Sequence, residues 1–354
     1  MDSLNYGVVG FGSIARTHAM GTYAANLTLK LPYFLNLKSI VTRSPLEIKV
    51  PGSENIQDID QLLKDPSIQF IDICTPNDAH KKLIESAANF GKAIYCEKPL
   101  AINYADALAL TEMVAEKEIK NGVALMYRFM PAVRLIKEEI ENKTIGDIID
   151  FKINLYHKSY LDKDKVGTWR TSKKSGGGAL LDLGVHLIDV IHFTLGDIKE
   201  VQCNTRIFFK EKSQMDEIAE CKFTLENGAV GNLEVSRIYA DMDETTSFVI
   251  YGTKGSIKMD SRKPYSIEVY NFEKNCIEIK SAKGHAEIIE NYPPERSSLG
   301  FHQDCHMACL VNFANEIYFS RTNTITPTFK DAMKAQKVIE VAYKSSVDGK
   351  KLKI

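Results

Sequence analysis

The sequence lacks an excess of charge of either sign, and it lacks paired cysteines. Its 354 residues include 45 lysines and arginines against 46 aspartates and glutamates, a formal net charge of −1. A chain without a positive excess has no general attraction for nucleic acid or for an anionic membrane, so we expect neither as a partner. The seven cysteines are scattered along the chain without a CxxC pair. This pattern is typical of reduced thiols and argues against a disulfide framework.

Long hydrophobic runs are also missing. Residues Met1 to Asn5 have neither the basic start nor the apolar stretch of a signal peptide. No apolar run reaches the roughly 20 residues that a membrane span needs. With 44% hydrophobic and 26% charged residues, the composition is that of an ordinary globular protein. We therefore expect a cytoplasmic protein, and its length suggests two domains.

The pattern of the sequence changes near residue 125. Up to that point short apolar strands alternate with helices, which predicts a parallel sheet with helices on both faces. After Pro131, segments rich in β-branched and aromatic residues follow one another, and Asn227-Gly228 has the composition of a hairpin turn. Helices are predicted over 180–194, 302–320 and 330–345. We therefore predict an α/β domain over 1–125 and an α+β domain over 126–354 with a large, mostly antiparallel sheet.

The first strand ends in a glycine-rich turn, Gly10-Phe11-Gly12-Ser13-Ile14-Ala15, with the spacing G-x-G-x-x-A. The first glycine allows a tight turn, the second lets a pyrophosphate approach the backbone, and Ala15 lets the helix pack on the strand. Phosphates would lie at the helix N-terminus, where free amides and the helix dipole favour negative charge. The alternative is a turn without a ligand. The position of the glycine-rich turn between a strand and a helix instead favours a dinucleotide-binding Rossmann domain.

The end of the second strand bears on the choice of dinucleotide. An acidic residue there would bind the ribose 2′-hydroxyl of NAD, whereas an arginine accommodates the 2′-phosphate of NADP. The chain has Thr42-Arg43-Ser44 and no acidic residue before Glu47. This favours NADP over NAD. In the alternative interpretation Arg43 is solvated and stacks on the adenine side of either cofactor.

A second motif, Glu97-Lys98-Pro99, follows a strand whose carboxyl end opens onto the predicted ligand crevice. Pro99 favours an extended backbone at Lys98, so that the lysine side chain can be aimed at a ligand. A lysine there could bind a ribose hydroxyl and a substrate oxygen. From the spacing alone, a surface Glu-Lys pair is the simpler interpretation.

The third motif runs from Gly176 to Asp189, with three glycines before a helix. Asp182 and His186 are four residues apart and would share one helix face. A carboxylate beside an imidazole fixes its tautomer and supports proton transfer. The alternative is an exposed stabilising pair. However, the neighbouring leucines and valine indicate a buried helix, where an ionisable pair needs a reason.

These segments, together with Thr75-Pro76-Asn77-Asp78-Ala79-His80, resemble in order and spacing the Gfo/Idh/MocA oxidoreductase family, which includes glucose–fructose oxidoreductase and inositol dehydrogenases. The resemblance covers essentially the whole chain. Two departures are visible. The stretch between Arg43 and Asp58 is shorter than usual, and Tyr127 stands where many relatives have Asn or His.

The resemblance implies hydride transfer between NAD(P) and a secondary alcohol of a sugar, cyclitol or sugar derivative. It assigns His186 as the general base, Asp182 as its orienting partner, and Lys98 as the group that holds the reacting oxygen and the nicotinamide ribose. The bond that corresponds to Lys98–Pro99 is cis in relatives, so the resemblance implies a cis bond here. The implied substrate-binding residues are Tyr127, His157, Arg170, Asp182 and His186. The implied cofactor-binding residues are Gly10, Phe11, Gly12, Ser13, Ile14, Thr42, Arg43, Thr75, Pro76, Asn77, His80, Glu97 and Lys98.

The resemblance also implies a homodimer or homotetramer formed through the sheet of the second domain, which binds the substrate. Two alternative functions stay open. One is a non-catalytic NAD(P)-sensing regulator, against which the joint presence of Lys98, Asp182 and His186 counts. The other is a glycoside-cleaving enzyme that oxidises its substrate transiently with bound NAD.

One further cluster has the spacing of a single helix face, with members at His302, Cys305, His306 and Cys309. These residue types can bind zinc. Four ligands on one helix rarely complete a tetrahedron, so we expect no metal and a face that packs inside the protein or lines the crevice. His302 could reach the substrate.

Overall fold

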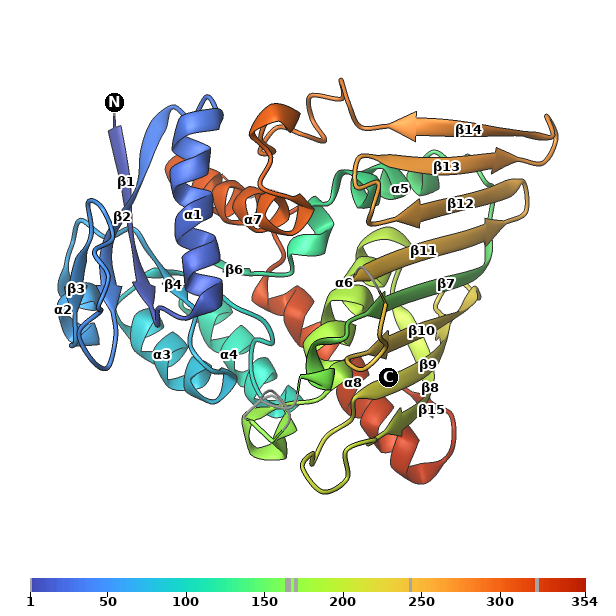
Figure 1. Ribbon diagram of the computed structural model, residues 1–354, viewed down its shortest axis with the longest axis horizontal. Coiled ribbons are helices and arrows are strands. Elements are labelled where there is room, and N and C mark those ends of the chain that lie inside the picture. The colour runs from blue at the N-terminus through green and yellow to red at the C-terminus, as the bar shows by residue number, and fades with distance from the viewer. Residues whose placement is uncertain (1, 163–166, 169–170, 242–243, 322–324) are drawn as a thin grey trace. The chain divides into compact units, whose positions relative to one another are not determined.

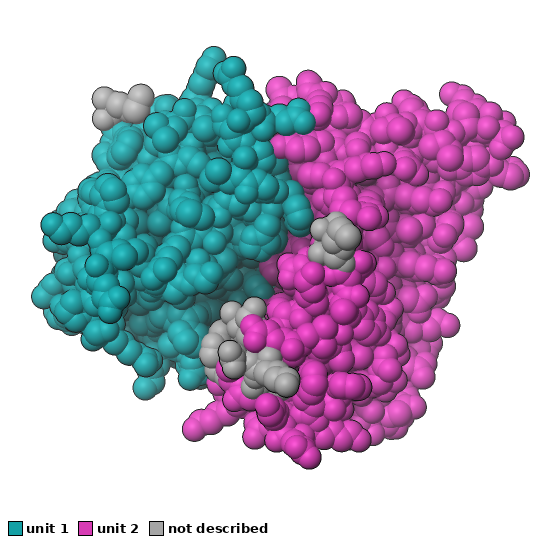
Figure 2. Space-filling view, in the orientation of Figure 1, with its two compact units in different colours: residues 1–126, 291–333 teal, residues 127–290, 334–354 magenta. Residues whose placement is uncertain are grey.

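The computed structural model describes residues 2–162, 167–168, 171–241, 244–321 and 325–354 (Figure 1). The chain forms two compact units (Figure 2). Unit 1 contains residues 1–126 and 291–333, and unit 2 contains residues 127–290 and 334–354. Residues 291–333 thus pack with the first unit, although they follow the second unit's sheet along the chain.

Unit 1 is built on a parallel sheet of six strands in the order β3-β2-β1-β4-β5-β6 (Figure 1). The order reverses between β1 and β4, and in sheets of this kind ligands bind at the carboxyl ends of the strands beside such a reversal. This confirms the predicted parallel sheet. The strands are β1 (Asp2–Val9), β2 (Tyr33–Val41), β3 (Glu54–Ile56), β4 (Phe70–Ile73), β5 (Ala93–Cys96) and β6 (Asn121–Val123).

The helices of unit 1 pack in pairs. Helix α1 packs on α7, and α3 packs on α4. The close approach of α1 to α7 depends on Gly21, since a Cβ atom there would lie 3.2 Å from the Cα atom of Met307. This packing is why α7 belongs to unit 1 although it lies far along the sequence. The helices are α1 (Ser13–Thr28), α2 (Ile59–Lys64), α3 (Asn77–Asn89), α4 (Tyr104–Glu116) and α7 (Phe301–Tyr318).

Unit 2 contains a nine-stranded sheet in the order β14-β13-β12-β11-β7-β10-β9-β8-β15. Only β7 and β10 pair in parallel among the strands described, so the predicted, mostly antiparallel sheet is confirmed. The strands are β7 (Ile148–Tyr156), β8 (Ile198–Arg206), β9 (Ile218–Leu225), β10 (Val230–Ser236), β11 (Thr245–Gly252), β12 (Gly255–Asp260), β13 (Ser266–Asn271), β14 (Cys276–Ser281) and β15 (Leu352–Lys353).

Helices cover one face of this sheet (Figure 1). The long ones are α5 (Pro131–Glu141), α6 (Val185–Thr194) and α8 (Phe329–Asp348). A π-helical turn, η5 (Leu180–Gly184), leads directly into α6. Short 3₁₀ turns are η1 (Met126–Phe129), η2 (Ser159–Leu161), η4 (Lys173–Ser175) and η6 (Glu295–Ser297).

One helical segment, Lys173–Thr194, differs from the expectation that no apolar run is long enough for a membrane span. Its 22 residues meet that test by length and composition. However, 83% of its most apolar window is buried inside the protein. The segment therefore has the surroundings of a core helix, whose apolar side chains pack against the rest of the unit.

The glycine-rich stretch before η5 folds over a buried carboxylate. Asp216 accepts hydrogen bonds from the backbone N–H of Leu180 and from the hydroxyl of Tyr343, both at 2.8 Å. Burial raises the pKa of Asp216 to about 6. Gly178 has φ of +110°, and a Cβ atom there would lie 2.5 Å from Oδ1 of Asp216. Only glycine therefore fits between this carboxylate and the start of the helix.

Gly196 provides a matched control for Gly178, because it has the same φ of +110° but a Cβ atom there would meet nothing within 4 Å. We expect Gly196→Ala to lower the free energy of unfolding by about 1–3 kcal/mol, the cost of the backbone conformation alone. Gly178→Ala should lose about 1–3 kcal/mol more, because the contact with Asp216 must also be relieved. Denaturant unfolding of both variants measures the difference. Equal losses would contradict the role given to Asp216.

Candidate active site

The glycine-rich turn after β1 has the geometry of a phosphate-binding turn. Gly10 has φ of +87°, and a Cβ atom there would lie 2.9 Å from the carbonyl oxygen of Cys74. At Gly12, by contrast, a Cβ atom would meet nothing within 4 Å. The first turn of α1 carries no acidic residue, and no side chain caps it. Open space thus lies over the free amides of a helix N-terminus, an arrangement that can accept a pyrophosphate.

The end of β2 is held by an edge strand rather than by a helix. The backbone N–H of Thr42 donates to Ile56 in β3, and the amide of Asn55 donates to the hydroxyl of Thr42 at 2.7 Å. That hydroxyl in turn donates to the carbonyl oxygen of Ser44. Arg43 is exposed, and no hydrogen bond or ion pair to another described residue holds its guanidinium. The guanidinium can therefore reach a ligand beside this strand.

The loop after β4 brings together the predicted residues from Thr75 to His80. Pro76 is exposed, whereas Asn77 at the start of α3 is buried. The hydroxyl oxygen of Thr75 is buried and makes no hydrogen bond within the described part of the chain. His80 is fully buried, and its ring nitrogens lie 3.0 Å from the carbonyl oxygens of Thr75 and Pro99. Burial also lowers the pKa of its imidazole. His80 therefore joins the loop after β4 to the loop after β5.

The Glu97-Lys98-Pro99 motif follows β5, as the sequence predicts. The Lys98–Pro99 peptide bond is cis. Glu97 is buried, and Oε2 of its carboxylate accepts the backbone N–H of Lys98 at 3.0 Å. Lys98 is half-buried at the carboxyl edge of the parallel sheet. The motif is therefore an ordered part of unit 1 rather than a solvated pair.

In unit 2, the predicted carboxylate Asp182 forms an ion pair with Arg237. Arg237 follows β10 and is 9% exposed. Its guanidinium also lies 5.4 Å from the ring centre of Tyr160 and donates to the hydroxyl of Ser159 at 3.3 Å. Sequence reasoning missed Arg237. Nothing around it forms a motif, and Asp182 is 55 residues away along the chain.

His186 lies on the first turn of α6 and is 6% exposed. Its ring centre is 5.2 Å from that of Tyr127, and the hydroxyl of Tyr127 lies 3.2 Å from that of Thr246. Asp182 belongs to the π-helical turn η5, so the regular α-helical spacing assumed between Asp182 and His186 does not hold. The structure brings together His186 with Tyr127, and Asp182 with Arg237.

The other predicted substrate contacts differ in their surroundings. Nδ1 of His157 lies 2.5 Å from Oε1 of Glu244, in an ion pair if the imidazole is protonated. Arg170 lies outside the described residues.

On helix α7, His302 is exposed, whereas His306 is buried. The thiol of Cys305 contacts the hydroxyl of Tyr292 at 2.9 Å, and that of Cys309 lies 3.8 Å from the carbonyl oxygen of Val123. Three of the four residues on this face, Cys305, His306 and Cys309, therefore pack inside unit 1.

The chain is similar to known proteins over most of its length. Residues 4–125 match the oxidoreductase family profile of an NAD-binding Rossmann fold, and residues 137–354 match the C-terminal alpha/beta domain of the same family. The chain belongs to the Gfo/Idh/MocA oxidoreductase family. The family predicted from the sequence is therefore confirmed.

Two relatives and one solved structure illustrate the range of this oxidoreductase family. Levoglucosan dehydrogenase of Pseudarthrobacter phenanthrenivorans is 28% identical over 298 residues, 76% of each chain. Glucose-6-phosphate 3-dehydrogenase of Bacillus subtilis is 25% identical over 359 residues, 98% of each chain. A solved structure of levoglucosan dehydrogenase in complex with NADH superposes with a TM-score of 0.91 at 25% identity, over 100% of this chain and 99% of that chain.

The residues of unit 1 fit a nicotinamide dinucleotide. The open space at Gly12 would take the pyrophosphate, and the buried hydroxyl of Thr75 makes no hydrogen bond to another described residue. Lys98 supplies an ammonium group at the same edge of the sheet. Unit 2 adds a buried imidazole at His186, the side-chain type that most often transfers protons near neutral pH.

Proposed function

We propose that this oxidoreductase transfers a hydride between NAD(P) and a secondary alcohol of a sugar, cyclitol or sugar derivative. The observation that carries the proposal is the buried imidazole of His186 on α6, beside Tyr127, in a chain whose other unit has an NAD-type phosphate turn. Two relatives named as dehydrogenases of levoglucosan and of glucose 6-phosphate support the substrate class.

The side chains divide the chemistry between them. When bound, the nicotinamide supplies the hydride acceptor. The imidazole of His186 takes the proton of the substrate hydroxyl, and the ammonium group of Lys98 stabilises the negative charge that develops on the same oxygen. Arg237 holds the carboxylate of Asp182 in place, so that Asp182 is fixed where it can orient the substrate or the imidazole.

The test is a panel of sugars, sugar phosphates and cyclitols with each cofactor, followed by absorbance of the reduced nicotinamide. We expect turnover with at least one member of the panel. His186→Ala should lower kcat by about 100- to 10,000-fold, the usual contribution of a general base, while NADH binding measured by fluorescence is unchanged. Unaltered kcat in this variant would contradict its assignment.

The same panel separates the two alternatives. Tight cofactor binding without turnover of any panel member would favour a regulator. Release of an aglycone without accumulation of reduced cofactor would favour a glycoside-cleaving enzyme that oxidises its substrate transiently. Either result would overturn the proposed dehydrogenase.

We propose that NADP is preferred over NAD. The exposed Arg43 at the end of β2 supports this preference, because its guanidinium is available to a 2′-phosphate. Arg43→Gln should lower kcat/KM for NADP by about 10- to 100-fold, the effect of losing one hydrogen bond to a charged group, and should change that for NAD little. Arg16, exposed on α1, provides the control variant Arg16→Gln. A wild-type enzyme that uses NAD better than NADP would contradict the proposal.

We also propose that the chain assembles as a homodimer or homotetramer through the outer face of the unit 2 sheet. Strand register places Tyr251, Tyr270 and Ile277 in one row across β11–β14, on the face opposite the buried Ile250 and Val269. Ile279, two residues after Ile277 on β14, shares this face, and the two isoleucines are 65% and 68% exposed. An exposed apolar patch of this kind is typical of an interface.

Light scattering after gel filtration tests the assembly against the chain mass of 39.7 kDa. The double substitution of Ile277 and Ile279 by lysine should shift the protein to the mass of a monomer, because charges would enter the interface. Phe208→Lys, at an equally exposed position (68%), should leave the oligomer intact. A monomeric wild type would refute the proposed assembly.

A further inference from the structure

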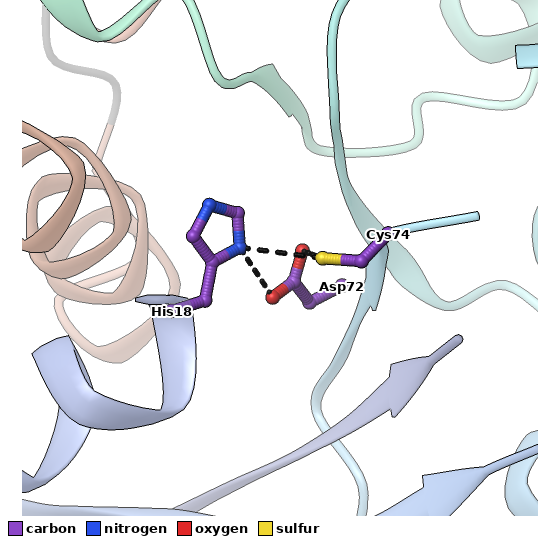
Figure 3. A group of neighbouring side chains, drawn as sticks. All are labelled: His18, Asp72 and Cys74. Carbon is purple, nitrogen blue, oxygen red and sulfur yellow. Dashed lines mark hydrogen bonds and ion pairs between the residues drawn. The ribbon is translucent and has the colours of Figure 1, made fainter. Parts of the chain in front are cut away.

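Unit 1 contains a group of buried titratable side chains that the proposed hydride transfer does not use as a set. His18 on α1, Asp72 on β4, Glu97 after β5 and His306 on α7 have side chains that are at most 7% exposed. Cys74 lies beside the first two, as Figure 3 shows. Burying this many ionisable groups is costly unless they compensate one another or hold a cation.

Asp72 fixes the orientation of the His18 ring. Nδ1 of His18 lies 2.8 Å from Oδ2 of Asp72 and 3.4 Å from Sγ of Cys74 (Figure 3). The thiol of Cys74 donates to the other oxygen of Asp72 at 3.3 Å. When Nδ1 of His18 donates its proton to the carboxylate, the lone pair on Nε2 points to the opposite side. A carboxylate behind an imidazole in this way is the usual second partner of a metal-binding histidine.

Three atoms that can bind a metal converge on the other side of the ring. Nε2 of His18 lies 3.2 Å from Nδ1 of His306 and 3.3 Å from Oε1 of Glu97, and the last two atoms are 4.0 Å apart. Oε1 of Glu97 is buried and makes no hydrogen bond to a described residue. Zinc bonds of about 2.0–2.2 Å in tetrahedral geometry separate neighbouring ligand atoms by roughly 3.3–3.6 Å. The observed separations match this geometry to within a few tenths of an ångström.

The charge of the cluster also calls for a cation. Asp72 and Glu97 are two buried carboxylates, and no lysine or arginine among the described residues forms an ion pair with either of them. Among the described contacts of the Glu97 carboxylate, Lys98 takes part through its backbone N–H and not through its ammonium group. A protonated histidine supplies one positive charge beside them, and a divalent cation in place of that proton would neutralise both carboxylates.

We propose that His18 Nε2, His306 Nδ1 and Glu97 Oε1 bind a divalent cation of the zinc class. Asp72 is the second partner of His18. Two imidazoles and one carboxylate are a donor set that zinc accepts, and three protein ligands leave the fourth position for water or another small oxygen ligand. The site differs from the cysteine and histidine face predicted on α7, since that face contributes only His306. The proposal does not rest on the proposed dehydrogenase activity, because its test measures metal binding directly.

The experiment uses the full chain, stripped with a chelator and then titrated with Zn²⁺ in competition with a chromophoric chelator. We expect a single ion bound per chain, and with Co²⁺ the visible absorption of a tetrahedral site. His306→Ala and His18→Ala should abolish this binding. Asp72→Asn should weaken it by about 10- to 100-fold, the usual effect of losing the partner behind a metal-binding histidine.

His285→Ala is the control, because His285 is an exposed histidine outside the cluster and should not affect affinity. His306→Gln keeps the side chain polar and of similar length in case the alanine variant unfolds. Zn²⁺ should also raise the Tm of the wild type and not that of His306→Gln. Failure of the wild type to bind Zn²⁺ would show that a proton is the only cation shared within the cluster, and would overturn the proposal. Equal affinity in the wild type and the His306 variants would do the same.

Discussion

The arrangement of unit 2 depends on the contact between Asp216 and the chain entering η5. This carboxylate accepts the first free N–H of the π-helical turn, at Leu180, and the hydroxyl of Tyr343 on α8. It thereby fixes the start of a helix that carries both Asp182 and His186. The close approach leaves no room for a side chain at Gly178. The glycines of the motif thus serve the position of the helix, and the helix determines where the imidazole lies.

A comparable constraint acts on Gly10 in unit 1. There a backbone carbonyl oxygen, rather than a carboxylate, occupies the space that a side chain would need. Gly10 turns the chain against the carbonyl oxygen of Cys74, and this contact sets the angle at which α1 leaves β1. Because β1 and β4 are neighbours at the reversal of strand order, the turn and the Thr75 loop lie at one edge of the sheet. His80 then ties that loop to Pro99. Three predicted segments are therefore connected, the last two through the side chain of His80.

What could be predicted from the sequence is what short-range patterns encode. The glycine turn, the motif at Lys98 and the helix at His186 each have fixed spacing over a few residues, and all three were found. Strand β14 was missed because its isoleucines are exposed, so no buried face marks it. The π-helical turn was missed because the sequence of η5 also fits a regular helix.

The partners of the site residues could not be predicted, because they come from distant parts of the chain. His18 and His306 are 288 residues apart, and no local pattern records that α1 and α7 pack together. Arg237 and Asp216 are single charged residues at strand ends, where a solvated side chain is the ordinary expectation. Such pairs depend on tertiary packing, which follows from the whole topology rather than from any one segment.

Two carboxylates of unit 2 that contact arginine differ from Asp72 and Glu97 of unit 1 in the charge of their partners. In unit 2, Asp189 on α6 receives two hydrogen bonds from the guanidinium of Arg128, at 2.6 and 2.8 Å, and Asp182 is paired with Arg237. Each thus has a permanent positive charge, since arginine does not lose its proton in proteins. In unit 1, the ion pairs described for Asp72 and Glu97 are with histidines alone. Histidine, unlike arginine, can give up its proton near neutral pH, so a divalent cation can take the place of that proton beside these two carboxylates.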